Sequence, residues 1–195
     1  AMLKKSGIPF VTMGLSKEPG VYQVDNDHEE ACHELTSILL MKGMKKIAVI
    51  AGDMNYIINQ NRLGGFCRAY QEQGMTPDES LIFMDAVTPV MIERAVDAVK
   101  NRSVSCIISA DDLIASAILQ KLEAEGLKIP IDIRLASFHD SGLLAASKVG
   151  ITAVKFNTEE LGREACRVLL RRIQGEDVPY VTKLPYEVAL RESTK

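Results

Sequence analysis

The chain has 195 residues, of which 47% are hydrophobic, and its formal net charge at pH 7 is −3. This length suffices for one hydrophobic core or two small lobes, and no apolar stretch approaches the roughly 18–20 residues of a membrane span. The lysines and arginines are scattered, so no basic face is concentrated enough for the chain to bind nucleic acid by itself.

The first third of the chain predicts two strands and a helix. The stretches "IPFVTMG" (8–14) and "VYQVDN" (21–26) have the composition of short strands. A helix is expected over 28–42, with Asp27 as its N-cap and Glu30 completing a capping box. Its buried stripe is predicted to contain Cys32, Leu35, Ile38 and Leu39.

The middle of the chain alternates between apolar strands and amphipathic helices. Its strands are predicted in "KKIAVIAG" (45–52), "SLIFMD" (80–85), "VSCIISA" (104–110) and "IRLASF" (133–138). The first intervening helix carries Leu63, Phe66, Cys67 and Tyr70 on one face. The second is capped by Thr88, and its buried stripe is expected to contain Met91, Ile92, Ala95, Val96 and Val99. The third ends at Gly126. Strands that are apolar throughout are typical of a parallel sheet covered on both faces. We therefore predict an α/β fold with a doubly wound parallel sheet over about 45–149.

The last part predicts a strand in "GITAVKF" (150–156) and a helix that begins at Asn157 and ends at Gly175. Its buried residues are expected to be Leu161, Ala165, Val168 and Leu169. The terminal "YVTKLPYEVALRES" (180–193) reads as extended structure. The outer pieces contain too few strands to form a complete lobe by themselves.

Polar residues follow several of the predicted strands. Asp53 follows "IAVIAG", Asp111 and Asp112 follow "CIISA", and His139 and Asp140 follow "LASF". In open α/β sheets, ligands bind beyond the carboxyl ends of the strands. We therefore expect these side chains to face a small ligand.

The loop after the first of these strands adds Tyr56, Asn59 and Arg62. A tyrosine, an amide and an arginine suit the recognition of hydroxyls or carboxylates. The glycines show no phosphate-binding spacing, so a nucleotide is not expected. Simpler roles stay open: Arg62 as a solvated helix-start residue, Asp112 as a helix N-cap and Asp140 as a turn residue.

Catalysis is the less favoured interpretation. His139 with Asp111 or Asp140 could form a base and its orienting partner, or a pair of metal ligands, but no nucleophile elbow is present. His28 and His33 are five residues apart, which is not a same-face spacing. The cysteines, Cys32, Cys67, Cys106 and Cys166, match no zinc spacing and are predicted to be buried, reduced thiols of a cytosolic protein. We predict a binding pocket without catalytic residue, metal or cofactor.

The chain from Ile8 onward resembles the effector-binding region of the LacI/GalR family of bacterial transcription regulators. The resemblance is carried, in order, by "VDNDHEEACHELTSILLMKGMKKIAVIAG", "RLGGFCRAYQEQGM", "SADDLIASAILQKLEAEGLKIPIDIRLASFHDS", "ITAVKFNTEELGREACRVLLRRIQGE" and "VALREST". The R-E-S ending is similar to the repressors rather than to the secreted sugar-binding proteins that share their fold.

The resemblance implies a type I periplasmic-binding-protein-like fold, in which two lobes are hinged around an effector. Residues 45–154 and 177–192 would form the C-terminal lobe, and residues 3–44 and 155–176 part of the N-terminal lobe. The first strands of the N-terminal lobe and the DNA-binding helix-turn-helix would be absent from this chain.

The resemblance also implies an effector-binding set. Arg62 lies where the family has an effector-gripping arginine, Asp111 at an Asn/Asp position, and His139 where an aspartate commonly takes sugar hydroxyls. An imidazole offers one donor and one acceptor when neutral and favours an anion when protonated. Tyr56, Asn59 and Phe138 complete the expected set.

The function that the resemblance implies is that of a cytoplasmic regulator's sensing domain. It would bind a small polar metabolite, with a sugar or sugar derivative favoured, and would control operator DNA through the absent helix-turn-helix. A homodimer is expected, with apolar surface from "IASAILQKL" (114–122). The alternatives are a solute-binding protein of a transporter and an enzyme on a similar scaffold.

Overall fold

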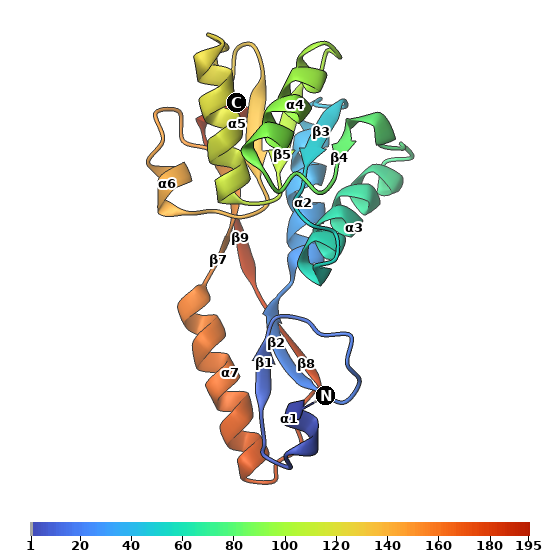
Figure 1. Cartoon of the computed structure of the whole chain (residues 1–195), viewed down its shortest axis with the longest axis vertical. Helices are drawn as coiled ribbons and strands as arrows, with labels where there is room; N and C mark the ends of the chain where they lie inside the picture. Colours follow the sequence, from blue (N-terminus) through green and yellow to red (C-terminus); the bar gives the residue numbers. More distant parts are fainter. Residues whose placement is uncertain (1) are drawn as a thin grey trace. The chain divides into compact units, whose positions relative to one another are not determined.

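The computed structural model describes residues 2–195, which fall into two compact units (Figure 1). The first unit contains the residues up to Asp27 together with Phe156–Tyr186, and the second contains His28–Lys155 and Glu187–Lys195. Each unit is thus built from two separate stretches of the chain. None of the described helices is both long and apolar enough to cross a membrane.

The first unit is a three-stranded parallel sheet with one long helix. Its strands β1 (Val11–Met13), β2 (Tyr22–Asn26) and β8 (Val181–Leu184) lie in the order β1-β2-β8. Helix α7 (Thr158–Ile173) packs against β1 and β2, and the short helix α1 (Met2–Lys5) lies near the amino terminus. The core is small and consists of Val24, Val168 and Val178, with Leu161 and Ala165 packed against it.

Helix α7 begins where the sequence predicts, because the Asn157 side chain accepts a hydrogen bond from the Glu160 N–H at 3.0 Å. The predicted residues do lie on the side of the helix that faces the sheet, but fewer of them are fully buried than predicted. Val168 is buried, whereas Leu161, Ala165 and Leu169 are half-buried. A sheet of only three strands provides too little surface to cover the whole apolar face of the helix.

The second unit contains a six-stranded sheet in the order β4-β3-β5-β6-β7-β9. Its strands are β3 (Ile47–Ile50), β4 (Ile82–Phe83), β5 (Cys106–Ser109), β6 (Arg134–Ser137), β7 (Thr152–Phe156) and β9 (Tyr186–Ala189). The pairs β3–β4, β3–β5, β5–β6 and β6–β7 are parallel, which confirms the predicted fold class.

The helices of this unit connect the strands (Figure 1). They are α2 (His28–Met41), α3 (Ile57–Glu72), α4 (Pro89–Lys100), α5 (Asp112–Ala124) and α6 (Gly142–Ala145), with short 3₁₀ turns η1 at Glu79–Leu81 and η2 at Glu192–Thr194. Helix α2 packs against α3, and α4 against α5. The chain moves from β3 to β4 in one direction along the sheet and from β5 to β6 in the other. Because such crossovers are right-handed, α3 and α5 cover opposite faces.

The cap of α4 is as predicted, since Thr88 Oγ1 accepts from the Met91 N–H at 3.3 Å. The prediction that Met91 is buried is wrong, because 39% of this residue is exposed. Ile92, Ala95, Val96 and Val99 form the buried face of the helix. Met91 lies in the first turn, at the margin of the contact with the sheet.

The expected lobes meet after residues 44, 154 and 176, whereas the two units of the structure meet after residues 27, 155 and 186. Helix α2 was expected in the first lobe but belongs to the second unit, and β8 belongs to the first unit because it pairs with β2. The reason for the first difference is the crossing of α2 with α3 at Gly65. A Cβ at this glycine would lie 2.1 Å from the Glu29 carbonyl oxygen, so the two helix backbones are in direct contact.

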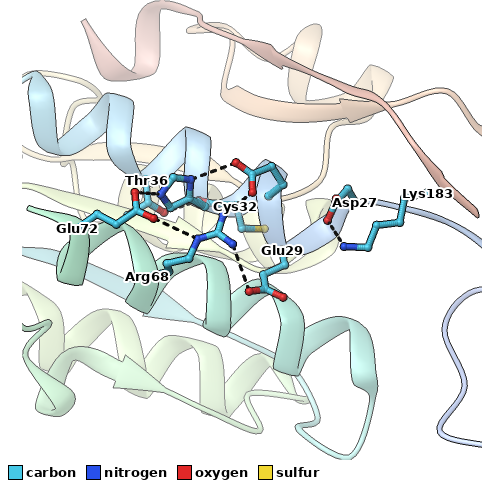
Figure 2. Close-up of polar contacts among 9 residues, drawn as sticks. Asp27, Glu29, Cys32, Thr36, Arg68, Glu72 and Lys183 are labelled. Carbon is cyan, nitrogen blue, oxygen red and sulfur yellow. Dashed lines mark hydrogen bonds and ion pairs between the residues drawn. The ribbon is translucent and has the colours of Figure 1, made fainter. Parts of the chain in front are cut away.

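Ion pairs reinforce this crossing. Arg68 of α3 forms ion pairs with carboxylates of both helices: it lies 3.4 Å from Glu29 of α2 and 3.6 Å from Glu72 of α3 (Figure 2). His33 Nε2 of α2 lies 2.7 Å from the same Glu72. These ion pairs add to the backbone contact between α2 and α3 within the second unit.

The end of the chain is fastened to the sheet of the second unit. The Ser193 hydroxyl donates to the Leu135 carbonyl at 2.6 Å and accepts from the Thr152 N–H at 2.8 Å. Thr194 Oγ1 lies 2.7 Å from Thr152 Oγ1. Both Ser193 and Thr194 are completely buried. The R-E-S-T segment thus closes β6 and β7 with hydrogen bonds.

Candidate functional site

Four neighbouring strands of the second unit end at the same level. Their register pairs Ile50 with Phe83 and with Ser109, and Ser109 with Ser137. The residues two or three positions beyond this row therefore lie along one edge, which we name the strand-end rim. It comprises Asp53, Asp85, Asp111, Asp112, His139 and Asp140.

The rim contains a topological switch point. From β3 the chain passes to β4 on one side, and β5 lies on the other side of β3. Ligands of open α/β sheets bind in the crevice at such a point. A Cβ built on Gly52, just after β3, would lie 3.4 Å from Asn59 Nδ2 of α3 and 3.9 Å from Ile114 Cδ1 of α5. The first turns of α3 and α5 therefore come together over the end of β3.

Arg62 and Asn59 are joined to the loop after β3 by a short chain of hydrogen bonds. Asn59 Nδ2 donates to the Asp53 carbonyl at 2.8 Å, and Arg62 Nη1 donates to Asn59 Oδ1 at 3.2 Å. Arg62 is only 6% exposed, so the alternative of a solvated helix-start residue is wrong. A buried guanidinium requires polar partners, and Asn59 supplies one while also fixing its orientation.

Asp111 and Asp112 have different roles from those considered for the sequence. Asp111 is the N-cap of α5, because its Oδ1 accepts from the Ile114 N–H at 2.9 Å. Asp112 was the expected cap but is the first helical residue, and its Oδ1 lies 3.6 Å from His139 Nδ1. The structure therefore brings together an acidic residue of α5 and the histidine that follows β6.

Asp140 is occupied by a structural ion pair. Arg191 donates to it through both terminal nitrogens, at 2.8 Å to Oδ1 and 2.6 Å to Oδ2. The Asp140 side chain is 8% exposed. The hydrogen bonds to Asp140 raise the pKa of Arg191 above its usual range, so the guanidinium stays charged. Asp140 thus anchors the end of the chain to the loop after β6.

The last two expected site residues have contrasting surroundings. Tyr56 precedes α3 and is 63% exposed, and its side chain makes no capping hydrogen bond to the described residues. Phe138 is completely buried, and its expected contact with a ligand stays a prediction. Its N–H donates to the Ser109 carbonyl at 2.9 Å, which extends the β5–β6 ladder by one residue and turns the ring into the core.

The thiols are only partly as predicted. Cys32 and Cys106 are buried, whereas Cys67 is half-buried and Cys166 is exposed on α7. Burial raises the pKa of Cys106 to about 12. Among the residues that the structure describes, no group of three or more histidine, cysteine or acidic side chains is arranged to hold a metal ion.

Sequence reasoning missed Arg191 and placed the cap of α5 one residue too late. Arg191 was noted only as part of an ending, and its contact with Asp140 spans 51 positions that no local pattern records. The simpler role of N-cap considered for Asp112 belongs to Asp111, because helix α5 begins at Asp112 itself. The D-D pair was the available signal, because only one of two adjacent aspartates can cap a helix.

Comparisons with known proteins agree with this geometry. Residues 36–194 match the family model described as "Periplasmic binding protein-like domain". The chain is 31% identical to the transcriptional regulator CelR of Thermobifida fusca, over 98% of the chain and 58% of the relative. It is 27% identical to catabolite control protein A of Staphylococcus xylosus, over 100% of the chain and 60% of the relative.

Solved structures show the same fold. A CelR–cellobiose complex superposes with a TM-score of 0.85 at 31% identity, covering 98% of this chain and 61% of that one. The regulator CcpA of Lactococcus lactis superposes with a TM-score of 0.88 at 27% identity, covering 99% of this chain and 72% of that one.

The chain spans about 58–60% of the length of these two curated relatives. CelR of Thermobifida fusca and CcpA of Lactococcus lactis are described as transcription regulators, which confirms the prediction that the chain is not an enzyme. The chain belongs to the periplasmic binding protein-like domain family and corresponds to the effector-binding domain of LacI-type transcriptional regulators.

Proposed function

We propose that this domain senses a small polar metabolite at the strand-end rim, with a sugar or sugar derivative favoured. The observation that carries the proposal is the buried Arg62, which Asn59 orients at the switch point between β3 and β5. A guanidinium carries several N–H donors, which suit a ligand with hydroxyl or carboxylate oxygens. The description of the CelR structure as a cellobiose complex supports a sugar.

In the longer regulator, ligand binding would control operator DNA in the cytoplasm through a helix-turn-helix domain. A ligand shifts a two-state equilibrium only by its differential affinity for the two states. The ligand found for this domain should therefore change the affinity of the full-length regulator for its operator. The descriptions of CelR and of the Lactococcus lactis CcpA as transcription regulators favour this role over that of a transporter's solute-binding protein.

The experiment is calorimetric titration of sugars and sugar derivatives into the wild-type domain and into Arg62→Ala. Loss of the arginine should weaken binding by about 1–3 kcal/mol, the cost of leaving ligand oxygens unpaired. Arg163→Ala is the control, because Arg163 lies exposed on α7 and pairs with Glu159 of the same helix. Equal binding by wild type and Arg62→Ala would place the ligand elsewhere.

The domain is also proposed to form a homodimer, but the expected surface at 114–122 needs adjustment. Ile114, Ala115, Ile118 and Leu122 are buried within the unit. Exposed leucines are instead Leu113 of α5 and Leu143 of α6, at 74% and 60%, on two helices that contact each other. Sedimentation equilibrium of Leu143→Glu tests this surface, since a buried charge would dissociate a dimer formed there.

A further inference from the structure

We infer that the close contact between α2 and α3, which Gly65 permits and Arg68 holds, positions the Arg62 guanidinium for the ligand. The inference rests on the proposed function, because Arg62 is the residue on which that proposal depends. Gly65 and Arg68 are therefore assigned as positioning residues, which affect a ligand only through Arg62.

Arg62 and Gly65 lie on the same buried face of α3. Residues three apart are neighbours on a helix surface, and these two are separated by only about 4.5 Å along the helix axis. Asn59, which accepts a hydrogen bond from Arg62 at 3.2 Å, lies three residues earlier and is also buried. A displacement of α3 at Gly65 therefore also moves Arg62 and its hydrogen-bond partner.

The separation of the two helices is set by their backbones at Gly65. A Cβ at this position would lie 2.1 Å from the carbonyl oxygen of Glu29 and 2.8 Å from the backbone nitrogen of His33. Only glycine, which has no Cβ, allows backbones to approach so closely. The obstacle is backbone rather than a side chain, so no change of rotamer relieves it. Any larger residue must push α3 away from α2.

The side chain of Arg62 also lies near α2. Cys32 of α2 is three residues beyond Glu29 and is completely buried. Burial raises the pKa of its thiol, and the positive charge of Arg62 partly opposes that rise. The charge of Arg62 thus acts on the turn of α2 that follows the contact with Gly65. The surroundings of the guanidinium consequently depend on α2 as well as on α3.

Arg68 holds the two helices together at the surface. Its guanidinium lies 3.4 Å from Glu29 and 2.5 Å from Glu30 of α2, and 3.6 Å from Glu72 of α3 (Figure 2). Without this charge, the carboxylates of α2 would face that of α3 and repel it. The Arg68 side chain is 33% exposed, so salt should screen this repulsion. Arg68 therefore stabilises the same short separation that Gly65 permits.

The first test measures the affinity of the domain for cellobiose by calorimetry. Gly65→Ala should weaken binding roughly tenfold, because it moves Arg62 away from its place beside β3. Gly64→Ala is the matched control, since its new Cβ would have the side chain of Glu29 as nearest neighbour, at 3.9 Å. It should bind within about twofold of wild type. Val99→Ala, at a completely buried position of α4, controls for a general loss of stability and should also bind normally.

Arg68→Ala loosens the same contact without adding an atom, so it tests the inference even if Gly65→Ala does not fold. It should weaken cellobiose binding about threefold at low salt, and the loss should shrink at high salt as the carboxylates are screened. Arg68→Lys keeps the charge and should restore most of the affinity. Arg163→Ala is the control, because it removes an exposed pair with Glu159 on α7 and should leave the affinity unchanged.

The effects of both substitutions on binding must pass through Arg62. In the Arg62→Ala background, Gly65→Ala and Arg68→Ala should therefore change the affinity by less than about twofold. A general structural role would weaken binding by the same factor in both backgrounds, and that result would overturn the inference.

Crystal structures of Arg68→Ala and Gly65→Ala provide a readout without any ligand. We expect α3 to move away from α2, with loss of the 2.8 Å hydrogen bond from Asn59 to the Asp53 carbonyl. If α3 keeps its wild-type place, or if both variants bind cellobiose as wild type does, the inference is overturned while a sensing role stands. If neither cellobiose nor another sugar binds the wild-type domain, the proposed function fails, and the crystal structures alone decide the placement of Arg62.

Discussion

Arg191 and Asp140 are 51 residues apart in the sequence and form a two-pronged ion pair, with both guanidinium terminal nitrogens on the two carboxylate oxygens at 2.8 and 2.6 Å. The pair joins the loop after β6 to the segment that follows β9. Asp140 belongs to the strand-end rim, but both of its carboxylate oxygens accept from Arg191, so this aspartate has a structural role.

Removal of Arg191 is expected to destabilise the second unit. In Arg191→Ala, the nearly buried Asp140 loses its charged partner, which should lower the free energy of unfolding by about 2–3 kcal/mol. Urea unfolding measures this change. Arg163→Ala removes an exposed i,i+4 pair instead and should change stability by less than about 0.5 kcal/mol. Equal effects of the two variants would contradict a special role for the Asp140 pair.

The crossing of α2 and α3 predicts opposite results for two adjacent glycines. In Gly65→Ala, the new Cβ would meet the Glu29 carbonyl at 2.1 Å, so the helices must separate and stability should fall by about 1–3 kcal/mol. In Gly64→Ala, the nearest atoms belong to the Glu29 side chain at 3.9 Å. That variant should gain roughly 0.5–1 kcal/mol from helix propensity. Thermal unfolding of both decides the matter.

The cap of α5 can be assigned by substitution. Asp111→Ala removes the acceptor for the Ile114 N–H and should cost about 1 kcal/mol, whereas Asp111→Asn retains an acceptor and should restore most of it. Asp112→Ala should cost less, since Asp112 is already helical. A larger loss for Asp112→Ala than for Asp111→Ala in denaturant unfolding would reverse the assignment.

The small side chain of Ser193 is expected to contribute substantially to the free energy of unfolding. Its hydroxyl both donates to Leu135 and accepts from Thr152, and it is completely buried. Ser193→Ala leaves those two backbone groups unpaired and should lower stability by about 1–3 kcal/mol. Glu192→Ala, at an exposed position in the same turn, serves as the comparison. The prediction fails if the two substitutions have the same effect on the urea midpoint.

The raised pKa of the buried Cys106 thiol predicts that the protein loses stability at alkaline pH. Its pKa is about 12 in the folded chain and near 8.5 when unfolded. Since folding favours the protonated thiol, its contribution is complete below about pH 8.5 and declines as the pH rises toward 12. Wild type should lose about 2 kcal/mol more than Cys106→Ala between pH 7 and 10, at 1.36 kcal/mol per pH unit. Cys166→Ala, at an exposed thiol, should follow wild type.

The sheet of the second unit was predictable because its signals are local. Runs such as Ile47–Ile50 and Cys106–Ser109 are apolar throughout, and each is followed by an amphipathic helix with a recognisable cap. Their burial on both faces follows directly from this composition. The polar residues at their carboxyl ends are placed by the same pattern, so most of the rim could be named in advance.

What could not be predicted depends on contacts between distant residues. The membership of α2 in the second unit depends on the space that Gly65 leaves for Glu29. The occupation of Asp140 depends on Arg191, and the burial of Phe138 on a ladder that extends one residue further than its strand pattern indicates. Periodicity shows which face of an element is apolar, but not which partner covers it.

The position of Ser193 and Thr194 in the chain has a consequence for synthesis on the ribosome. The hydrogen bonds from Ser193 to β6 and β7 are formed by a residue that is synthesised after all the strands. Strand β8, which completes the first unit, is also made late, after the whole alternating region. Chains fold largely from the amino terminus as they emerge. We therefore expect nascent chains that stop short of residue 181 to leave both sheets incomplete and accessible to chaperones.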